Sequence, residues 1–74
     1  MKKKGRFYVA DGSTNIPLRA QPENGYTWMQ AIERAQREIE ECIKLFGGKF
    51  QDYKGAYTVL DSNFCEVKEA QNAI

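Results

Sequence analysis

The feature that most constrains this fold is a regular apolar spacing between Thr27 and Gly48. Apolar residues recur there at steps of four, three, four, three and four, namely Trp28, Ile32, Ala35, Ile39, Cys42 and Phe46. Because an α-helix has about 3.6 residues per turn, this spacing places all of these side chains on one stripe of a helix. A stripe of this kind needs a second apolar surface to pack against, and the rest of the chain must supply it.

Both ends of the predicted helix carry the usual end signals. Thr27 is a favourable N-cap residue, and Gln30 completes a capping box, in which each side chain accepts the backbone N–H of the other residue. Gly47 can adopt the left-handed conformation that ends many helices. We therefore predict one helix over residues 27–46. Truncation of Ile39 or Phe46 to alanine is expected to cost several kcal/mol, as at other buried positions.

Segments that favour β-structure flank the helix on both sides. The first ends at Asp11-Gly12, a strong turn signal, and is followed by alternating apolar and polar residues, which predicts a hairpin over residues 7–20. Pro17 has no N–H to donate, so the second strand of this hairpin is expected at a sheet edge. A second hairpin is predicted over residues 50–69, with its turn at Asp61-Ser62-Asn63. Residues 49–55 fit either a strand or a loop.

This order of segments predicts an α+β fold with one four-stranded antiparallel sheet (ββαββ) and the helix on one face. The chain of 74 residues is expected to form a single small domain, with a basic flexible arm at residues 1–6 and a frayed tail at residues 70–74. The sheet face toward the helix is expected to carry Phe7, Val9, Ile16, Leu18, Tyr57, Val59, Cys65 and Val67.

The composition excludes several kinds of site. The chain has no histidine, so it cannot form a Ser-His-Asp or Cys-His arrangement by itself, and it lacks the commonest metal ligand. There is no GxxxxGK phosphate loop. Cys42 and Cys65 match no metal or redox spacing, and we interpret them as buried, reduced thiols. We therefore expect a non-enzymatic protein with no catalytic residues, no metal and no cofactor.

The chain also lacks segments that direct proteins to membranes. No apolar run approaches the roughly 20 residues that cross a bilayer, and no apolar segment follows the basic N-terminus as it would in a signal peptide. We expect a cytoplasmic protein with no membrane partner.

A partner surface is expected on the sheet face turned away from the helix. The predicted register leaves five residues there without cover, most of them apolar or aromatic, namely Tyr8, Ala10, Thr58, Leu60 and Phe64. Exposed patches of this kind mark protein interfaces, and tyrosine is enriched in their hot spots. The main hypothesis is therefore a protein-binding module, such as an inhibitor of a host protein, or a homodimer. The predicted partner-binding residues are Tyr8, Tyr53, Tyr57, Leu60 and Phe64.

Two alternatives remain open. Residues 1–19 carry five cations and one anion, against a net charge of +1 for the whole chain. Such a basic arm favours nucleic-acid binding, with Tyr8 or Phe64 stacking on bases. The residues predicted for that role are Lys2, Lys3, Lys4, Arg6 and Arg19. The second alternative is an oligomer that holds a small nucleotide-like ligand between aromatic rings.

Three stretches resemble short ββαββ proteins of phages and gut bacteria. The first is Tyr8-Val9-Ala10-Asp11-Gly12, a strand that ends in Asp-Gly. The second is the capped helix start from Thr27 to Ala31. The third runs from Tyr57-Thr58-Val59-Leu60-Asp61 into Phe64-Cys65-Glu66-Val67. The resemblance implies the ββαββ fold and a bacterial or mobile-element setting, and it implies no site residues.

Overall fold

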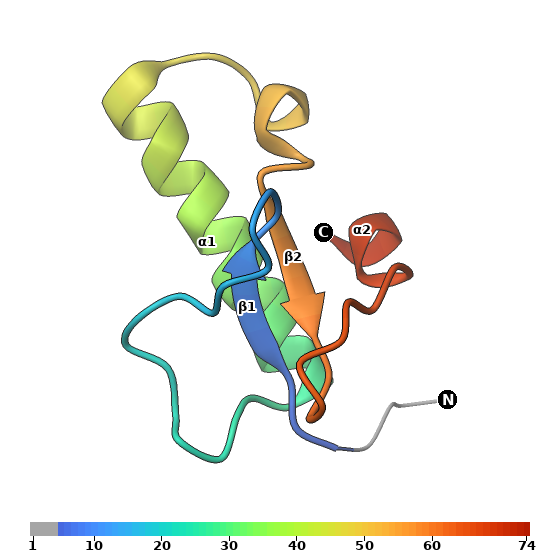
Figure 1. The fold of residues 1–74 in the computed structure, drawn as a ribbon. Helices are drawn as coiled ribbons and strands as arrows, with labels where there is room; N and C mark the ends of the chain where they lie inside the picture. The colour runs from blue at the N-terminus through green and yellow to red at the C-terminus, as the bar shows by residue number, and fades with distance from the viewer. Residues whose placement is uncertain (1–4) are drawn as a thin grey trace.

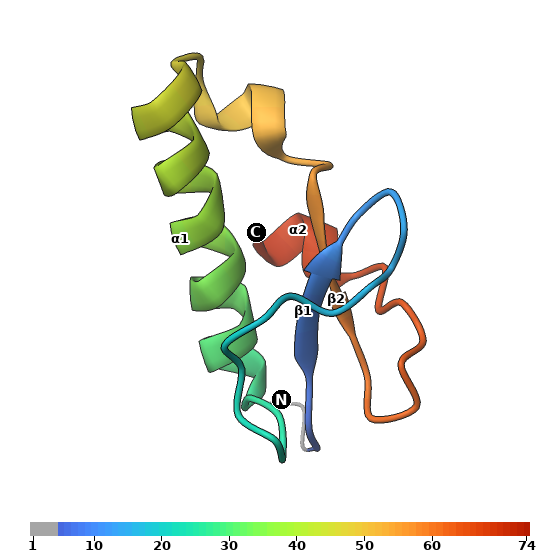
Figure 2. The ribbon, with the colours of Figure 1, turned by 60° about the vertical axis from the view of Figure 1, so that its left-hand side comes forward.

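The computed structural model describes residues 5–74. Its elements follow in the order β1 (Tyr8–Asp11), α1 (Trp28–Phe46), the 3-10 helix η1 (Phe50–Tyr53), β2 (Tyr57–Leu60) and α2 (Ala70–Ala73) (Figure 1). Strands β1 and β2 pair side by side, and α1 packs along one face of the pair (Figure 2). The fold is α+β, as predicted. None of the helices in the described part of the chain is both long and apolar enough to cross a membrane.

Helix α1 begins and ends where the sequence predicts. The Thr27 hydroxyl oxygen accepts the backbone N–H of Gln30 at 3.2 Å, and the Gln30 side-chain oxygen accepts the N–H of Thr27 at 3.1 Å. At the other end, Gly47 adopts a φ of 81° and donates its N–H to the carbonyl oxygen of Ile43. Local capping chemistry therefore determines both helix ends.

The predicted four-stranded sheet is wrong, because the described residues form one sheet of two antiparallel strands. Tyr8 lies opposite Leu60, and Asp11 lies opposite Tyr57. Each predicted return strand meets its neighbour only at one isolated bridge, Ala10–Pro17 on one side and Leu60–Glu66 on the other. A sheet edge bonded this sparsely does not extend into a further strand.

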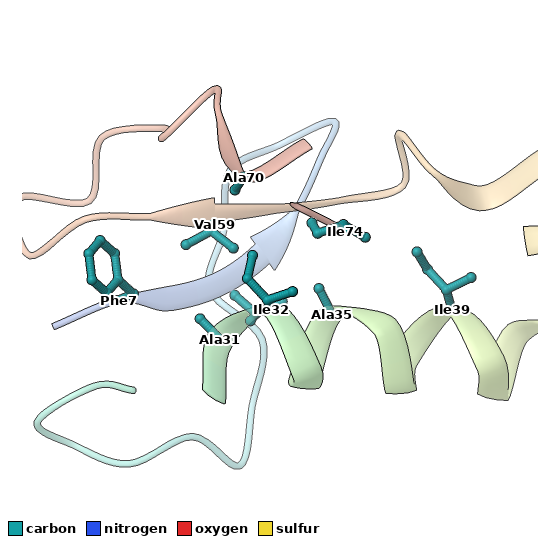
Figure 3. Close-up of a cluster of buried hydrophobic side chains, with 9 residues drawn as sticks. Phe7, Ala31, Ile32, Ala35, Ile39, Val59, Ala70 and Ile74 are labelled. Atoms are coloured by element: carbon teal, nitrogen blue, oxygen red, sulfur yellow. The ribbon is translucent and has the colours of Figure 1, made fainter. Parts of the chain in front are cut away.

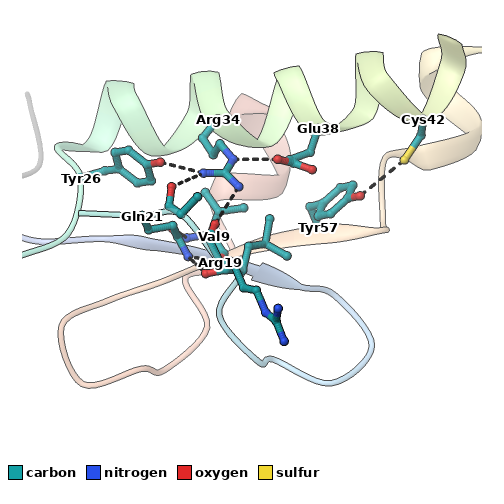
Figure 4. A network of polar contacts seen from close by, with 10 residues as sticks. Val9, Arg19, Gln21, Tyr26, Arg34, Glu38, Cys42 and Tyr57 are labelled. Atoms are coloured by element: carbon teal, nitrogen blue, oxygen red, sulfur yellow. Dashed lines mark hydrogen bonds and ion pairs between the residues drawn. The ribbon is translucent and has the colours of Figure 1, made fainter. Parts of the chain in front are cut away.

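Glutamine side chains replace the missing strands at both edges of the sheet. The amide of Gln21 accepts the N–H of Val9 at 2.7 Å and donates to the carbonyl oxygen of the same residue at 2.9 Å (Figure 4). On the other edge, Gln71 donates its amide N–H to the carbonyl oxygen of Tyr57 at 2.7 Å. The bond to the Val9 N–H and the bond from Gln71 satisfy backbone groups that a neighbouring strand would otherwise have to bind, while the Val9 carbonyl oxygen also accepts the N–H of Leu18 at 2.9 Å. The return segments can therefore run as loops.

The segment after α1 is not a strand. Phe50–Tyr53 forms η1, and the Asp52 carboxylate accepts the N–H of Lys49 at 2.9 Å at its start. The Tyr53 hydroxyl donates to the carbonyl oxygen of Gly47 at 2.6 Å, which ties η1 to the end of α1. The second predicted hairpin thus loses the first part of its range, and its strand begins only at Tyr57.

The core lies between α1 and the sheet (Figure 3). Its buried members are Phe7, Val9, Ala31, Ile32, Ala35, Ile39, Val59, Ala70 and Ile74. The ring of Phe7 meets that of Trp28 edge to face, with centroids 5.3 Å apart. The predicted frayed tail is wrong, because residues 70–73 form α2 and both Ala70 and Ile74 are buried in this core.

Phe46 was expected in the core, but 78% of its surface is exposed. The cause is a mismatch of lengths. Helix α1 has 19 residues and each strand has four, which correspond to about 28 Å and about 13 Å. The end of the apolar stripe therefore extends past the sheet. Ile16 and Cys65 were also expected to face the helix and are exposed.

The face of the sheet away from α1 is not open, contrary to prediction. Ala10 and Leu60 are fully buried, and Thr58 is 2% exposed. Figure 2 shows the loops that follow β1 and β2 on this side of the sheet. Because the return segments run as loops, they fold over the face that a flat four-stranded sheet would leave uncovered. Only Tyr8, which is half-buried, and Phe64 remain accessible among the residues predicted there.

Candidate functional site

Two of the predicted partner-binding residues, Tyr8 and Phe64, lie together and form what we call the aromatic platform. Their ring centroids are 5.0 Å apart and their planes are tilted by 31°. Phe64 is 55% exposed. The Tyr8 hydroxyl donates to the carbonyl oxygen of Glu23 at 3.0 Å, which holds the ring against the loop before α1. The platform thus presents one fixed ring and one exposed ring.

Phe64 has an unusual backbone conformation, with a φ of 61°. Left-handed backbone costs an L-residue about 1–2 kcal/mol, and a bulky side chain there is an outlier. The loop is held in place by Asp61, whose carboxylate accepts the N–H groups of Asn63 and Cys65 at 2.9 and 3.0 Å. The backbone of Asp61 bonds Phe64 and Cys65 as well. The turn predicted at residues 61–63 is confirmed, and it fixes Phe64 in a strained, exposed position.

The other three predicted partner-binding residues lie elsewhere. Leu60 is fully buried. Tyr53 is half-buried and its hydroxyl bonds Gly47. Tyr57 lies on the face toward α1, with its hydroxyl oxygen 3.4 Å from the sulfur of Cys42 (Figure 4). The five residues therefore do not form a single surface.

The contact between Tyr57 and Cys42 changes the acidity of the phenol. The hydrogen bond with Cys42, followed by desolvation, raises the pKa of Tyr57 to about 12. A phenol with this pKa stays protonated near neutral pH, where it cannot act as a general base. Both cysteines are free thiols, as predicted, but Cys65 is exposed and only Cys42 is half-buried.

The sequence prediction missed Arg34, which makes a polar network of four contacts among the described residues (Figure 4). Its guanidinium donates to the carbonyl oxygens of Arg19 and Ala20, at 3.0 and 2.9 Å, and to the hydroxyl of Tyr26 at 3.0 Å. It also forms an ion pair with Glu38 at 2.8 Å. The side chain is only 14% exposed. The available signal was the i, i+4 spacing of Arg34 and Glu38; nothing in the sequence indicated the two carbonyl partners.

The electrostatics of Arg34 follow from these contacts. Desolvation by burial opposes its charge, but the hydrogen bonds to Tyr26 and Glu38 raise its pKa above the ordinary value. The charge is therefore retained under all ordinary conditions. The guanidinium binds the carbonyl oxygens of Arg19 and Ala20, and Ala20 has a φ of 60°, which is unusual for a residue with a Cβ. Arg34 thus fixes the loop of residues 19–26 onto α1.

A shallow depression of about 570 Å³ lies beside Arg34. Most of its lining is charged, with both signs present: Arg34, Arg37, Glu38, Glu40, Glu41 and Lys44. A mixed lining of this kind selects neither an anionic nor a cationic ligand. Among residues 5–74, no group of three or more cysteine, aspartate and glutamate side chains could hold a metal ion.

The residues predicted to bind nucleic acid are only partly described. Arg6 and Arg19 are exposed. Lys2, Lys3 and Lys4 lie outside the described residues. Two rings were expected to stack on bases. Tyr8 lies two residues after Arg6 in the chain, and the ring of Phe64 packs against the ring of Tyr8.

The chain matches no model of a known protein family, no curated protein and no solved structure.

Proposed function

We propose that this chain is a non-enzymatic protein-binding module that contacts its partner through the aromatic platform of Tyr8 and Phe64. One observation carries the proposal: Phe64 is 55% exposed and has a φ of 61°. Strained backbone conformations cluster at functional sites, because the surrounding structure must offset their energetic cost.

The platform has the properties of an interface hot spot. Exposed aromatic rings dominate the binding energy of many interfaces, particularly when they are rigid before binding. The ring of Tyr8 and the bonds of Asp61 hold Phe64 in place. A partner would therefore not have to order this side chain on binding.

The platform is also connected to the polar network of α1. Tyr8 bonds the carbonyl oxygen of Glu23, in the loop that Arg34 anchors through Ala20. Together with the loop backbone between Ala20 and Glu23, these contacts link the helix to the exposed ring. Arg34 thus acts as a positioning residue for the platform.

Affinity capture with matched baits tests this proposal. Wild-type protein and the variants Phe64→Ala and Ile16→Ala are immobilised and exposed to extract of the source cells. Ile16 is a suitable control because it is 64% exposed and pairs with Asp11 at the far end of β1. We expect a protein that wild-type and Ile16→Ala retain and that Phe64→Ala loses. With the purified partner, Phe64→Ala should weaken binding at least tenfold.

Two results would contradict the proposal. One is a partner that binds Phe64→Ala as tightly as it binds wild-type. The other is a partner lost equally with Phe64→Ala and Ile16→Ala, since that would place the contact elsewhere.

Single-stranded nucleic acid is a second candidate ligand. The observation that favours it is that the exposed Arg6 precedes β1, whose first residue, Tyr8, packs against Phe64. Aromatic rings beside a cation can stack on unpaired bases. The test is fluorescence anisotropy with labelled oligonucleotides at low salt. Binding that weakens steeply as salt rises and is lost in Phe64→Ala would support this ligand, and no binding at low salt would exclude it.

A further inference from the structure

The loop before α1 contains the one Asn-Gly pair of the sequence, Asn24-Gly25. Asparagine followed by glycine is the pair most prone to deamidation, because glycine has no side chain that hinders attack by its own backbone nitrogen. Asn24 is exposed, and Glu23 and Asn24 form the middle of a turn. Water therefore has access to the side-chain amide of Asn24.

The reaction needs only this chain and water. Hydroxide removes the backbone proton of Gly25, and the nitrogen then bonds Cγ of Asn24. The bond from Cγ to the side-chain nitrogen breaks, and this nitrogen takes a proton from water and leaves as ammonia. Water opens the resulting cyclic imide at either carbonyl carbon. One product is aspartate, and the other is isoaspartate, whose backbone is longer by one carbon.

In the folded protein, hydrogen bonds hold the turn against this reaction. The N–H of Gly25 is donated to the carbonyl oxygen of Pro22 at 2.9 Å, which fixes the peptide plane and makes the proton harder to remove. Within the same turn, the carbonyl oxygen of Glu23 accepts the hydroxyl of Tyr8 at 3.0 Å. Attack on Asn24 therefore requires a local opening of the turn.

The turn is also packed closely against the start of β1. Gly25 has a φ of 82°, and a Cβ on it would lie 3.1 Å from Cζ of Tyr8. The next residue, Tyr26, exchanges both backbone hydrogen bonds with Phe7, at 2.7 and 2.9 Å. An isoaspartate would lengthen the path from Glu23 to Tyr26, which are bonded to neighbouring residues of β1 and its approach. One of these contacts would then have to shift.

The one Asp-Gly pair of the sequence is protected by different means. The Asp11 carboxylate accepts the hydroxyl and the backbone N–H of Ser13, at 2.6 and 2.8 Å, and these bonds lower the pKa of its carboxyl. An ionised carboxylate has no leaving group for imide formation. The N–H of Gly12 is donated to the carbonyl oxygen of Ala56 at 2.8 Å. This leaves Asn24-Gly25 as the more reactive pair.

We propose that Asn24 is a site of spontaneous deamidation, that the hydrogen bond from Tyr8 to Glu23 slows the reaction, and that conversion to isoaspartate frees the ring of Tyr8 from the loop. Each opening of the turn breaks this bond, so the folded chain reacts more slowly than the unfolded chain. The inference goes beyond the proposed function, since the reaction requires no partner and its readouts are chemical and spectroscopic.

Incubation of the full chain in mildly alkaline buffer tests the protection. Intact mass reports the replacement of an amide by a carboxyl group, and peptide mapping locates it. Tyr8→Phe removes only the hydroxyl, so Asn24 should deamidate about fivefold faster, the factor that one lost hydrogen bond gives to a local opening. Tyr53→Phe is the matched control, because it removes a hydroxyl bonded to the carbonyl oxygen of Gly47, and its rate should equal that of wild-type.

Three results would overturn the site or its protection. The first is an equal rate for Tyr8→Phe and wild-type, or an equal increase in Tyr53→Phe. The second is a difference between Tyr8→Phe and wild-type that persists in urea, where the fold is absent. The third is faster reaction at another asparagine (Asn15, Asn63 or Asn72) than at Asn24.

The isoaspartate form, separated by ion exchange, tests the effect on Tyr8. We expect its NMR spectrum to show shifted ring protons for Tyr8 and Phe64, whose centroids are 5.0 Å apart in the unmodified chain. Asn24→Asp adds the same charge without the extra backbone carbon, so its ring signals should stay unchanged. Unchanged signals in the isoaspartate form, or equal shifts in Asn24→Asp, would overturn this effect. Neither outcome bears on partner capture, which uses the unmodified protein.

Discussion

The guanidinium of Arg34 donates to the carbonyl oxygen of Ala20 at 2.9 Å, and Ala20 has a φ of 60°. This bond joins the middle of α1 to a loop residue in a conformation that alanine rarely adopts. A second bond, to the carbonyl oxygen of Arg19, comes from the same guanidinium. The planar guanidinium of arginine matches such paired acceptors, so this side chain holds the loop in its observed conformation.

Arg34→Lys should therefore destabilise the fold despite keeping the charge. Lysine cannot reproduce the fork, and two carbonyl oxygens would lose their donors, at a cost of about 2 kcal/mol. Urea unfolding measures this loss. Arg37→Lys, at an exposed position of the same helix, should change stability by less than about 0.5 kcal/mol. Equal midpoints for the two variants would show that the network contributes little.

At position 64, glycine should be more stable than alanine. Phe64→Gly and Phe64→Ala both remove the ring contact with Tyr8, but only glycine accepts a φ near 61° without strain. The expected difference is about 1 kcal/mol in favour of glycine. The control is Glu40, on the exposed face of α1, where the order should be reversed. There Glu40→Ala should be more stable than Glu40→Gly by a similar amount, because glycine disfavours a helix. Thermal unfolding of the four variants gives both comparisons, and the same order at both positions would refute the strain.

Thr58→Val should stabilise the protein. Thr58 is 2% exposed, and within the described chain its hydroxyl oxygen has no hydrogen-bond partner. Replacing an unbonded buried hydroxyl by a methyl group of similar size should raise the free energy of unfolding by about 1 kcal/mol. Thr58→Ser keeps the hydroxyl and loses a buried methyl group, so it should be less stable than wild-type. Chemical denaturation decides the order, and a destabilised Thr58→Val would indicate that the hydroxyl is bonded.

Ile39→Ala and Phe46→Ala should differ sharply. Ile39 is fully buried, so its truncation should cost about 2–4 kcal/mol. Phe46 is exposed, so its truncation should cost less than about 1 kcal/mol. Urea unfolding measures the loss of stability in both variants. A large loss for Phe46→Ala under these conditions would restore the core position that the helical stripe alone predicts.

The stability of the fold should fall at high pH through Tyr57. Its pKa is raised from 10.0 to about 12, so the folded state holds the phenolic proton more tightly than the unfolded state. The resulting stabilisation is fully present below about pH 10 and is lost as the pH rises through about 12. Denaturation midpoints between pH 9 and 12 measure the fall. Tyr57→Phe should flatten this part of the profile, and an unchanged slope would contradict the assignment.

Local signals made α1 predictable. Its capping box lies within four consecutive residues, and its apolar period is visible in the sequence. The extent of the sheet was not predictable in this way, because it depends on Gln21 and Gln71 folding back onto strands far away in the chain. The exposure of Phe46 depends on the relative lengths of helix and sheet, which no local pattern contains.

The candidate site was likewise predictable from the sequence only in part. Composition and strand alternation identified Tyr8 and Phe64 as accessible aromatic residues. The same alternation wrongly placed Leu60 with them, because it cannot show that the loops cover that face. The positive φ of Phe64 arises from bonds to Asp61, and Arg34 acts through carbonyl groups 14 and 15 residues away. Backbone acceptors leave no trace in the amino-acid sequence, so both features emerge only from the folded chain.

The amides of Gln21 and Gln71 have one more consequence. A bare strand edge offers a row of N–H and C=O groups on which any extended chain can align, and this is a common route to aggregation. In this protein the Gln21 side chain binds both backbone groups of Val9, and Gln71 binds the carbonyl of Tyr57. The bonds that replace further strands at Val9 and Tyr57 also prevent strands of other molecules from pairing at these backbone groups. This small sheet is therefore protected from growth at its edges.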